Sequence, residues 1–252
     1  MNFEEVGIII AKIKNTNNPK LDKTVSVETD KNKVKERIDK IQLDKEFEIM
    51  QHIPSNRERD VVYITGQSGS GKSYYTKALA EEYRNKFKKN DIYLFSSVEK
   101  DALDKIKGLK RVKLSNELLN VSYEDLNLNN CLLIFDDTDV ISNKFHKKKI
   151  DEILNIALQK GRHNNVSIYY TSHQPNNGKE TKIILAEAHS ITFFNTLGNR
   201  SLKYLLEGSF GFSTKQINNI RKIDSRWYTI FKTFPLVVMH QKGAYVVEKT
   251  DL

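Results

Sequence analysis

Val61-Val-Tyr-Ile-Thr65 leads directly into Gly66-Gln-Ser-Gly-Ser-Gly-Lys-Ser73, and helical spacing follows from Lys72 toward Phe87. The eight residues after the apolar run match G-x-x-x-x-G-K-[ST] at every defined position. The glycines let backbone N–H groups turn toward an anion, and the start of a helix adds partial positive charge at the same point. A strand, a glycine-rich loop and a helix in this order predict a P-loop, which cradles the phosphates of a nucleotide.

The loop is expected to act through its backbone and through two side chains. Lys72 would reach the β- and γ-phosphates of ATP, and the Ser73 hydroxyl would complete the coordination of Mg²⁺. A chance match is the alternative, and the flanking strand and helix argue against it. ATP and Mg²⁺ are therefore the predicted cofactors. The predicted contacts with ATP are Gly66, Gln67, Ser68, Gly69, Ser70, Gly71, Lys72, Ser73 and Tyr74.

A second apolar run ends in two carboxylates. Leu132-Leu-Ile-Phe135 precedes Asp136 and Asp137, as expected of a buried strand that carries acidic residues to the carboxyl edge of a sheet. Asp136 is the predicted metal-side carboxylate. Asp137 would activate or orient the attacking water; a helix cap or surface residue is the alternative for it, and Asp139 is the reserve candidate.

Polar residues also end the next strand, in Tyr169-Tyr-Thr-Ser-His-Gln-Pro175. A residue at this edge is in a position to sense the γ-phosphate or the water. Gln174 is the predicted sensor, because a neutral amide positions water without a change of charge. His173 could instead move a proton, although a lone histidine is more often structural or on the surface.

Two arginines are candidates for a finger that acts on the nucleotide of a neighbouring subunit. Arg162 lies between a helix and a strand in Gly161-Arg-His163, and Arg200 follows the next strand in Gly198-Asn-Arg-Ser-Leu202. The sequence slightly favours Arg162. A solvated arginine is the alternative for each.

Apolar runs and helical patterns alternate from Asp60 onward, which is typical of a parallel sheet wrapped by helices. The expected fold is an α/β P-loop NTPase with a mainly parallel central sheet flanked by helices, a small N-terminal appendage and C-terminal β-hairpins. The predicted domains are residues 1–55, the appendage, and residues 56–252, the ATPase domain with its hairpin region.

Capping boxes and apolar patterns place the remaining elements. Ser96 with Glu99 is expected to open a helix, and Ser213 with Gln216 to open a basic helix that reaches Arg221. Further strands are expected at residues 91–95, 131–135, 166–171 and 190–194, helices at 147–160 and 183–188, and hairpins at 227–248.

Composition limits the compartment and the partners. The single Cys131 excludes a disulfide framework, no apolar run approaches the roughly 20 residues of a membrane helix, and the chain starts with acidic residues. We expect a soluble, intracellular protein without stable membrane insertion. The formal charge of +9 would suit a polyanionic partner, and a solvated surface is an equal alternative reading of the charge.

Trp227 and Tyr228 beside Arg226 could stack on nucleic acid. Alternating apolar positions in a hairpin are more often part of the core.

Four of these segments together resemble the FtsK-HerA superfamily of pumping ATPases. They are Gln67 to Ser73, Phe135 to Asp137, Gln159 to His163 and Thr171 to Pro175. The likeness is greatest to the DNA-packaging ATPases of nucleocytoplasmic large DNA viruses, of the poxvirus type, and it runs from about Glu46 to Glu248.

The resemblance implies an ATP-hydrolysing motor that forms a homo-oligomeric ring and translocates double-stranded DNA into a viral capsid. It implies a capsid or portal protein as a partner, and the host cytoplasm, a virus factory or the virion as the location. It also implies Asp136 near magnesium, Asp137 as the base, Gln174 as the sensor and an arginine that acts in trans. Many members of the superfamily have glutamate where this chain has Asp137.

Two other functions remain alternatives. A small-molecule or nucleoside kinase shares the P-loop, but it needs a lid, and no arginine-rich lid segment stands out between the second and third core strands. A phage-type assembly or export NTPase acts on protein partners, and normally carries a transmembrane segment.

Overall fold

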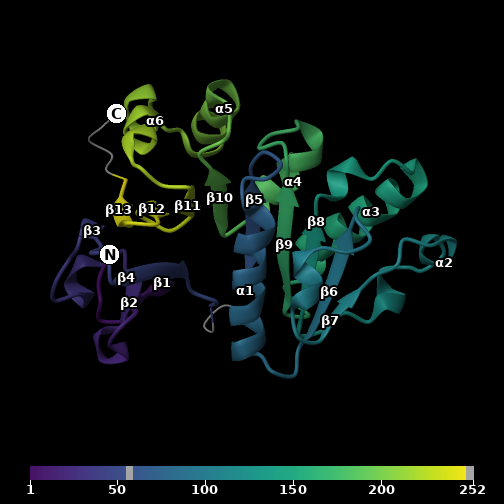
Figure 1. Cartoon of the computed structure of the whole chain (residues 1–252), viewed down its shortest axis with the longest axis horizontal. Coiled ribbons are helices and arrows are strands. Elements are labelled where there is room, and N and C mark those ends of the chain that lie inside the picture. The colour runs from purple at the N-terminus through teal and green to yellow at the C-terminus, as the bar shows by residue number, and fades with distance from the viewer. Residues whose placement is uncertain (55–58, 248–252) are drawn as a thin grey trace. The chain divides into compact units, whose positions relative to one another are not determined.

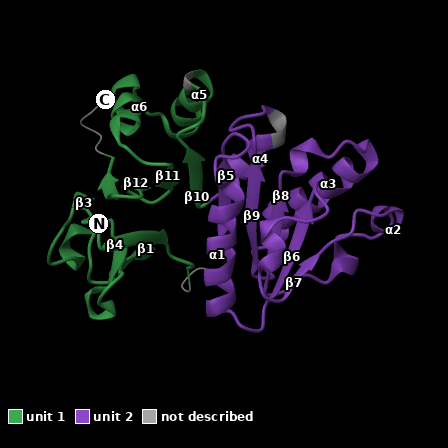
Figure 2. Ribbon diagram, in the orientation of Figure 1, with its two compact units in different colours: residues 1–56, 189–252 green, residues 57–188 purple. Residues whose placement is uncertain are grey.

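The computed structural model describes residues 1–54 and 59–247, without the side chains of residues 179, 180 and 199. Contacts within the chain divide it into two compact units (Figure 2). One unit is residues 57–188, and the other combines residues 1–56 with residues 189–252. The chain therefore passes between units close to the predicted domain boundary. The predicted assignment of everything after that boundary to one ATPase domain stays a prediction.

A parallel sheet forms the centre of the 57–188 unit (Figure 1). Its strand order, β5-β9-β8-β6-β7, confirms the parallel sheet predicted from the alternating pattern. Its middle strands are apolar because they are covered on both faces, and every residue of β8 is buried. The bounds are Val61–Thr65 for β5, Asp91–Ser96 for β6, Leu109–Arg111 for β7, Cys131–Asp136 for β8 and Val166–Ser172 for β9.

Helices and short 3-10 turns connect these strands (Figure 1). The helix that follows the P-loop packs against β5 and β9, and the helix before β9 also contacts that strand. Arg59 is buried and donates to the carbonyls of Ala157 and Leu158, so it satisfies the last turns of the latter helix. The elements are α1 (Lys72–Lys86), η3 (Ala102–Lys105), α2 (Asn116–Leu119), η4 (Glu124–Leu126), η5 (Thr138–Val140), α3 (Lys144–Lys160) and α4 (Lys179–Glu187).

The predicted capping box of Ser96 and Glu99 is wrong. Ser96 is the last residue of β6, and its hydroxyl accepts a hydrogen bond from the Val98 amide at 3.3 Å, which turns the chain instead of starting a helix. The next helical turn is η3, and Asp101 caps it in a box with Asp104.

The other unit is antiparallel throughout its described strands. Three strands in the order β2-β1-β4 form one sheet, and β10, β11, β12, β13 and β3 pair in succession. The strands are β1 (Ile8–Asn15), β2 (Lys23–Val27), β3 (Lys40–Gln42), β4 (Phe47–Gln51), β10 (Ser190–Phe194), β11 (Trp227–Phe231), β12 (Val237–His240) and β13 (Gly243–Val246). The helical elements are η1 (Pro19–Leu21), η2 (Lys31–Lys33), α5 (Asn199–Phe210) and α6 (Thr214–Lys222).

One hydrophobic cluster holds the early strands and the late hairpins together. Ile10, Ile13 and Val25 pack with Phe231 and Val237 in it. Because a three-stranded sheet is too small to bury a core alone, the hairpins supply the opposite wall of this core. The hairpins are confirmed as far as the described residues reach.

The aromatic residues near β11 belong to the core. Tyr228 is 3% exposed and stacks on Phe193 at a centroid distance of 5.2 Å, and Trp227 packs against the hydrophobic cluster. This placement supports the hairpin-core alternative and leaves Tyr228 unable to stack on nucleic acid. The capping box of Ser213 and Gln216 is confirmed at the start of α6.

Candidate functional site

The glycine-rich loop joins β5 to α1 with two glycines in the left-handed region. Gly69 has φ +74°, and Gly71, the N-cap of α1, has φ +109°. A side chain at either position would strain the backbone, so the motif needs glycine there. The Gly66 amide donates to Ser172 O at 3.3 Å, which ties the loop to the end of β9. The Ser70 hydroxyl is buried in the loop without a hydrogen-bond partner among the described residues.

Lys72 lies under this loop and is only 4% exposed. Its ammonium donates to the carbonyls of Gly66 at 2.9 Å and Gln67 at 3.4 Å. It also lies 3.1 Å from His173 Nδ1 and 3.7 Å from Asp137 Oδ1. The predicted phosphate-binding lysine is therefore next to the predicted base, at the carboxyl edge of the sheet.

Asp136 ends β8 as a buried carboxylate. The Thr171 hydroxyl donates to Asp136 Oδ1 at 2.9 Å and accepts from the Asp137 amide at 2.9 Å. Burial raises the pKa of Asp136 to about 6, despite the opposing effect of the Thr171 hydrogen bond. The fold thus holds a carboxylate whose charge is costly until a cation comes near it.

Asp137 points back toward the P-loop. Its backbone has φ +47°, in the left-handed region, and its Oδ2 lies 3.0 Å from His173 Nε2. Asp137 precedes the η5 turn, but its side chain makes no cap hydrogen bond there. The helix-cap alternative is therefore wrong, and the carboxylate faces Lys72 and His173.

His173 bridges the lysine and the carboxylate. Because an ammonium group only donates, Nδ1 accepts from Lys72, and Nε2 is then the N–H that Asp137 accepts. Sequence reasoning ranked His173 below Gln174. The strand register contained the missing signal: Phe135 pairs with Tyr170, so the residues that follow these two strands meet at the same edge.

Gln174 is exposed, and the contacts that hold it in place are made by its main chain. Its carbonyl accepts from Tyr63 Oη at 2.6 Å and from Ser172 Oγ at 3.1 Å. Ser172 Oγ also lies 2.9 Å from Asp139 Oδ2, so Asp139 helps to shape this edge. The backbone of Gln174, the predicted sensor, is thus fixed, and its side chain is exposed.

The chain shares most of its length with a viral protein. It is 37% identical over 193 residues to the uncharacterized protein V3 of Sputnik virophage, a match that covers 76% of this chain and 78% of V3. This chain belongs to the V3 family. A family model described as RNA helicase also matches residues 62–157, which include the P-loop and β8.

Comparison with solved structures gives a match with a TM-score above 0.5 for this V3-family chain. The cytoplasmic domain of the type VII secretion ATPase EccC of Thermomonospora curvata has a TM-score of 0.56 at 14% identity, over 83% of this chain and 29% of that chain. The DNA-packaging ATPase B204 of Sulfolobus turreted icosahedral virus has a TM-score of 0.48 at 16% identity, over 77% of this chain and 98% of its own. The predicted α/β P-loop NTPase fold is confirmed.

The two predicted arginines lie away from the P-loop or in the other unit. Arg162 is exposed in the turn that enters β9, so it lies at the amino edge of the sheet, opposite the P-loop edge. Arg200 is exposed in the first turn of α5, and its guanidinium lies 5.7 Å from the Tyr204 ring centroid. Arg162 is thus on the wrong edge to act on the nucleotide of its own chain. An action of either arginine in trans stays a prediction.

Magnesium fits the donors that the site offers. Ser73 follows Lys72 in the first turn of α1, and Asp136 supplies a buried carboxylate whose raised pKa a nearby cation would lower. Both are hard oxygen donors, which Mg²⁺ prefers. No group of three or more His, Cys, Asp or Glu that could hold a metal occurs in the described part of the chain. This pattern matches Mg²⁺ bound by few protein oxygens together with phosphates and water.

None of the helices in residues 1–54 and 59–247 has the length and apolar run that crossing a bilayer requires.

Proposed function

We propose that this chain hydrolyses ATP and uses the energy to translocate double-stranded DNA, most directly to package a viral genome into a capsid. The observation that carries the proposal is the convergence of Lys72, Asp137 and His173 beside the P-loop, with 3.0 to 3.7 Å between neighbouring polar atoms. Hydrolysis of a phosphoanhydride depends mainly on positioning and on charge stabilisation, and these groups provide both.

In this proposal water attacks the γ-phosphorus, the bond from that phosphorus to the β–γ bridging oxygen breaks, and ADP leaves with phosphate as the other product. Lys72 stabilises the charge on the phosphate oxygens, and Asp137 orients the water and accepts its proton. Gln174 contacts the water or the γ-phosphate from the end of β9. Ser73 and Asp136 would hold Mg²⁺, which would neutralise charge on the β- and γ-phosphates.

The segment between β6 and β8 argues against a kinase. A kinase lid needs arginines free to close over the phosphates, and the one arginine in this segment is Arg111. Its guanidinium is held by Asp104 at 2.7 and 2.8 Å, by Asp101 at 3.3 Å and by Val98 O at 2.6 Å. This arginine fixes a loop to the edge of the sheet, so it is not available to a lid.

The DNA substrate and the ring are proposed from the sequence resemblance and from the charge of +9. A ring gives Arg162 or Arg200 a nucleotide to reach in the neighbouring subunit. A capsid or portal protein would anchor the ring. Assembly ATPases that act on protein partners are the second candidate, and they would not respond to DNA.

Steady-state ATP hydrolysis, with and without long duplex DNA, tests the proposal. The assay should span a salt series and a range of protein concentrations. We expect DNA to stimulate turnover, the stimulation to fade with salt and turnover per chain to rise with protein concentration. Hydrolysis that is indifferent to DNA would reject the motor function.

A further inference from the structure

Arg84 ties together two loops at the amino edge of the parallel sheet. From α1, its Nη1 donates to the carbonyls of Lys88 at 3.1 Å and Asn90 at 2.6 Å, and its Nε donates to Lys107 O at 3.0 Å. A Cβ on Gly108, which has φ +73°, would lie 3.4 Å from Arg84 Nη2. One guanidinium thus holds the loop that enters β6 against the loop that enters β7.

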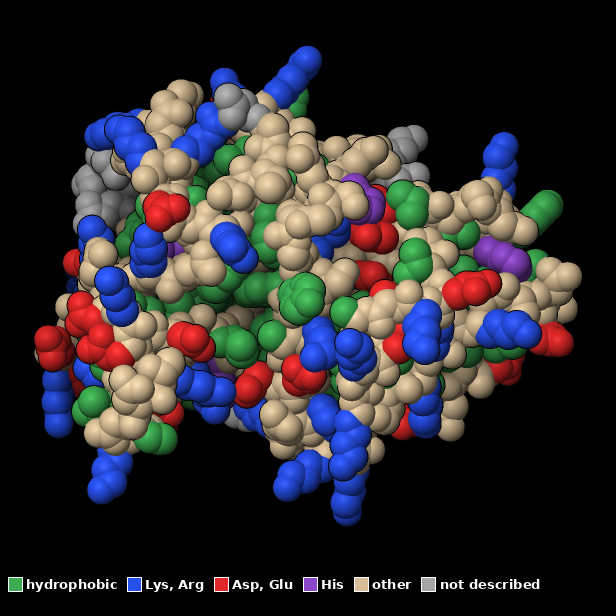
Figure 3. Space-filling view, in the orientation of Figure 1, with side chains coloured by type: hydrophobic (Ala, Val, Ile, Leu, Met, Phe, Trp, Pro, Cys, Tyr) green, Lys and Arg blue, Asp and Glu red, His purple; other side chains and the backbone are tan. Residues whose placement is uncertain are grey.

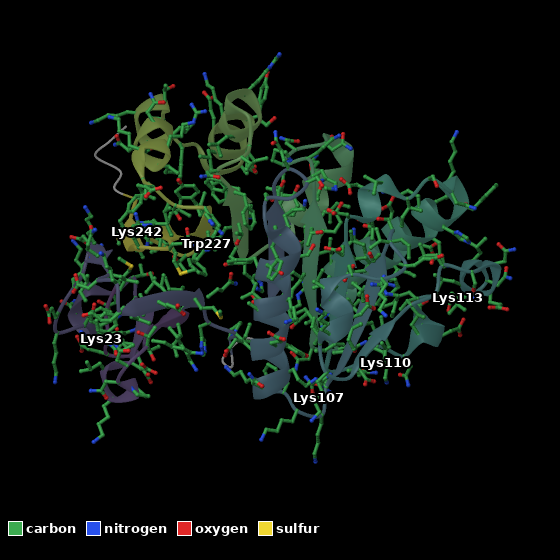
Figure 4. The ribbon with its side chains drawn as sticks, viewed as in Figure 1. Lys23, Lys107, Lys110, Lys113, Trp227 and Lys242 are labelled. Carbon is green, nitrogen blue, oxygen red and sulfur yellow. The ribbon has the colours of Figure 1, made fainter. Side chains whose placement is uncertain are left out.

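Five exposed lysines lie at the end of α1, on these two loops and at the end of η3, which contacts α1. We call them the lysine platform: Lys86, Lys88, Lys89, Lys105 and Lys107. Figure 3 shows blue side chains projecting from the lower side of this unit, and Figure 4 labels Lys107 there.

The carboxylates near the lysine platform are already paired. Asp91 lies 2.8 Å from Lys110 Nζ, and Asp104 accepts from Arg111. Within residues 1–54 and 59–247, no carboxylate lies within ion-pair distance of Lys88, Lys89, Lys105 or Lys107. These four lysines therefore keep their positive charge without a carboxylate partner in the described part of the chain.

We propose that the lysine platform binds the phosphate backbone of duplex DNA, which rests on the DNA-motor function proposed above. Exposed lysines attract phosphates without regard to base sequence, as a motor that moves along any genome requires. A single strand would need open aromatic faces for stacking. The nearby Phe87 packs on Tyr83 at a centroid distance of 4.9 Å and is not a free platform for bases.

The proposal also gives a physical link between DNA and ATP. Helix α1 begins at Lys72 in the P-loop and ends at Lys86 in the lysine platform, 15 residues later. An uninterrupted helix of that length spans roughly 22 Å and moves as a stiff rod. One helix therefore joins the phosphate-binding loop to the proposed DNA contact.

Replacing Lys88, Lys89, Lys105 and Lys107 together by Gln tests the proposal in the full-length chain. We expect basal ATP hydrolysis and thermal stability to match the unchanged protein, and duplex affinity to fall at least tenfold at moderate salt. The slope of log affinity against log salt should lose roughly 2 to 4 units. A variant with Arg at the same four positions should keep the duplex affinity and the salt slope of the unchanged protein.

The matched control replaces four exposed lysines of the other unit, Lys12, Lys20, Lys31 and Lys45, by Gln. It removes the same charge and should change duplex binding less than threefold. An equal loss of duplex affinity in both variants, or no loss in the platform variant, would overturn the proposed DNA contact at the lysine platform. The proposed motor function would not be affected by either result. If the unchanged protein does not bind duplex DNA at all, both proposals fail.

Discussion

The two edges of the parallel sheet use charged residues in opposite ways. At the carboxyl edge, Lys72, Asp136 and Asp137 are largely buried, and each contacts another polar side chain of the site. At the amino edge, the side chains of Lys88 and Lys107 are exposed, and Arg84 donates to their backbone carbonyls.

This difference separates two kinds of task. Buried, mutually oriented charges act at short range on one reacting group, since their field is weakly screened. Exposed charges act on a long, mobile polyanion and are screened by salt. Substitutions at the carboxyl edge should therefore alter ATP turnover. Substitutions at the amino edge should alter only DNA binding and the stimulation of turnover by DNA.

Lys72→Ala should have the largest effect. It removes the only ammonium under the P-loop among the described residues, so turnover should fall at least about 10³-fold with and without DNA. Turnover measured by phosphate release checks this outcome. Retention of more than a tenth of the activity would reject the catalytic role of the P-loop.

Asp137→Asn should lower kcat about 10²- to 10³-fold, because the amide keeps the shape but removes the base. Nucleotide affinity, measured by titration with a fluorescent ATP analogue, should change little. The matched variant is Asp139→Asn, which alters the Ser172 contact and should cost less than tenfold. Equal losses in the two variants would contradict the assignment of Asp137 as the base.

Asp136 should give the apo protein a distinctive pH dependence. Its pKa is raised to about 6, so the folded state binds more protons than the unfolded state between about pH 4 and 6. The free energy of unfolding should therefore fall as pH rises through this window, by up to about 3 kcal/mol. Carboxylates that are paired with a cation titrate at lower pH. The hydrogen bond from Arg111, for example, lowers the pKa of Asp104 to about 2.

Denaturant unfolding of the wild type and of Asp136→Asn, without metal or nucleotide, measures this effect. The stability of the variant relative to the wild type should increase from pH 4 to pH 7. A difference that stays constant with pH would show that Asp136 does not titrate in this window.

His173→Ala should have the smallest effect, about a tenfold drop in kcat, because it frees Lys72 and Asp137 from their shared partner. His173→Gln should recover part of the loss through its amide. His163→Ala, at an exposed position, should have no effect. A KM increase with unchanged kcat would instead assign His173 to nucleotide binding.

The sequence predicted the parts of the site that local patterns determine. The P-loop depends on spacing and on two glycines with positive φ, and Asp136 depends on the end of one apolar strand. His173 was ranked below Gln174, because its contacts with Lys72 and Asp137 join three separate segments and no local pattern shows them. Gln174 remains the predicted sensor on sequence grounds.

Two features of the fold were missed. Helix α5 was not predicted, although Leu202, Leu205 and Leu206 have the apolar spacing of a helix and are buried. The joint core of the early strands and late hairpins was also missed. This core joins segments more than 200 residues apart in the sequence, such as Ile10 and Phe231, and no local pattern encodes such packing.

Displacement of a triplex-forming oligonucleotide from duplex DNA tests ATP-driven translocation most directly. With ATP and Mg²⁺, the full-length chain should displace the oligonucleotide, and the time to displacement should lengthen with the distance travelled along the duplex. Lys72→Ala should displace none. Robust ATP hydrolysis on the same DNA without displacement would contradict the account, because ATP turnover would then not be coupled to movement.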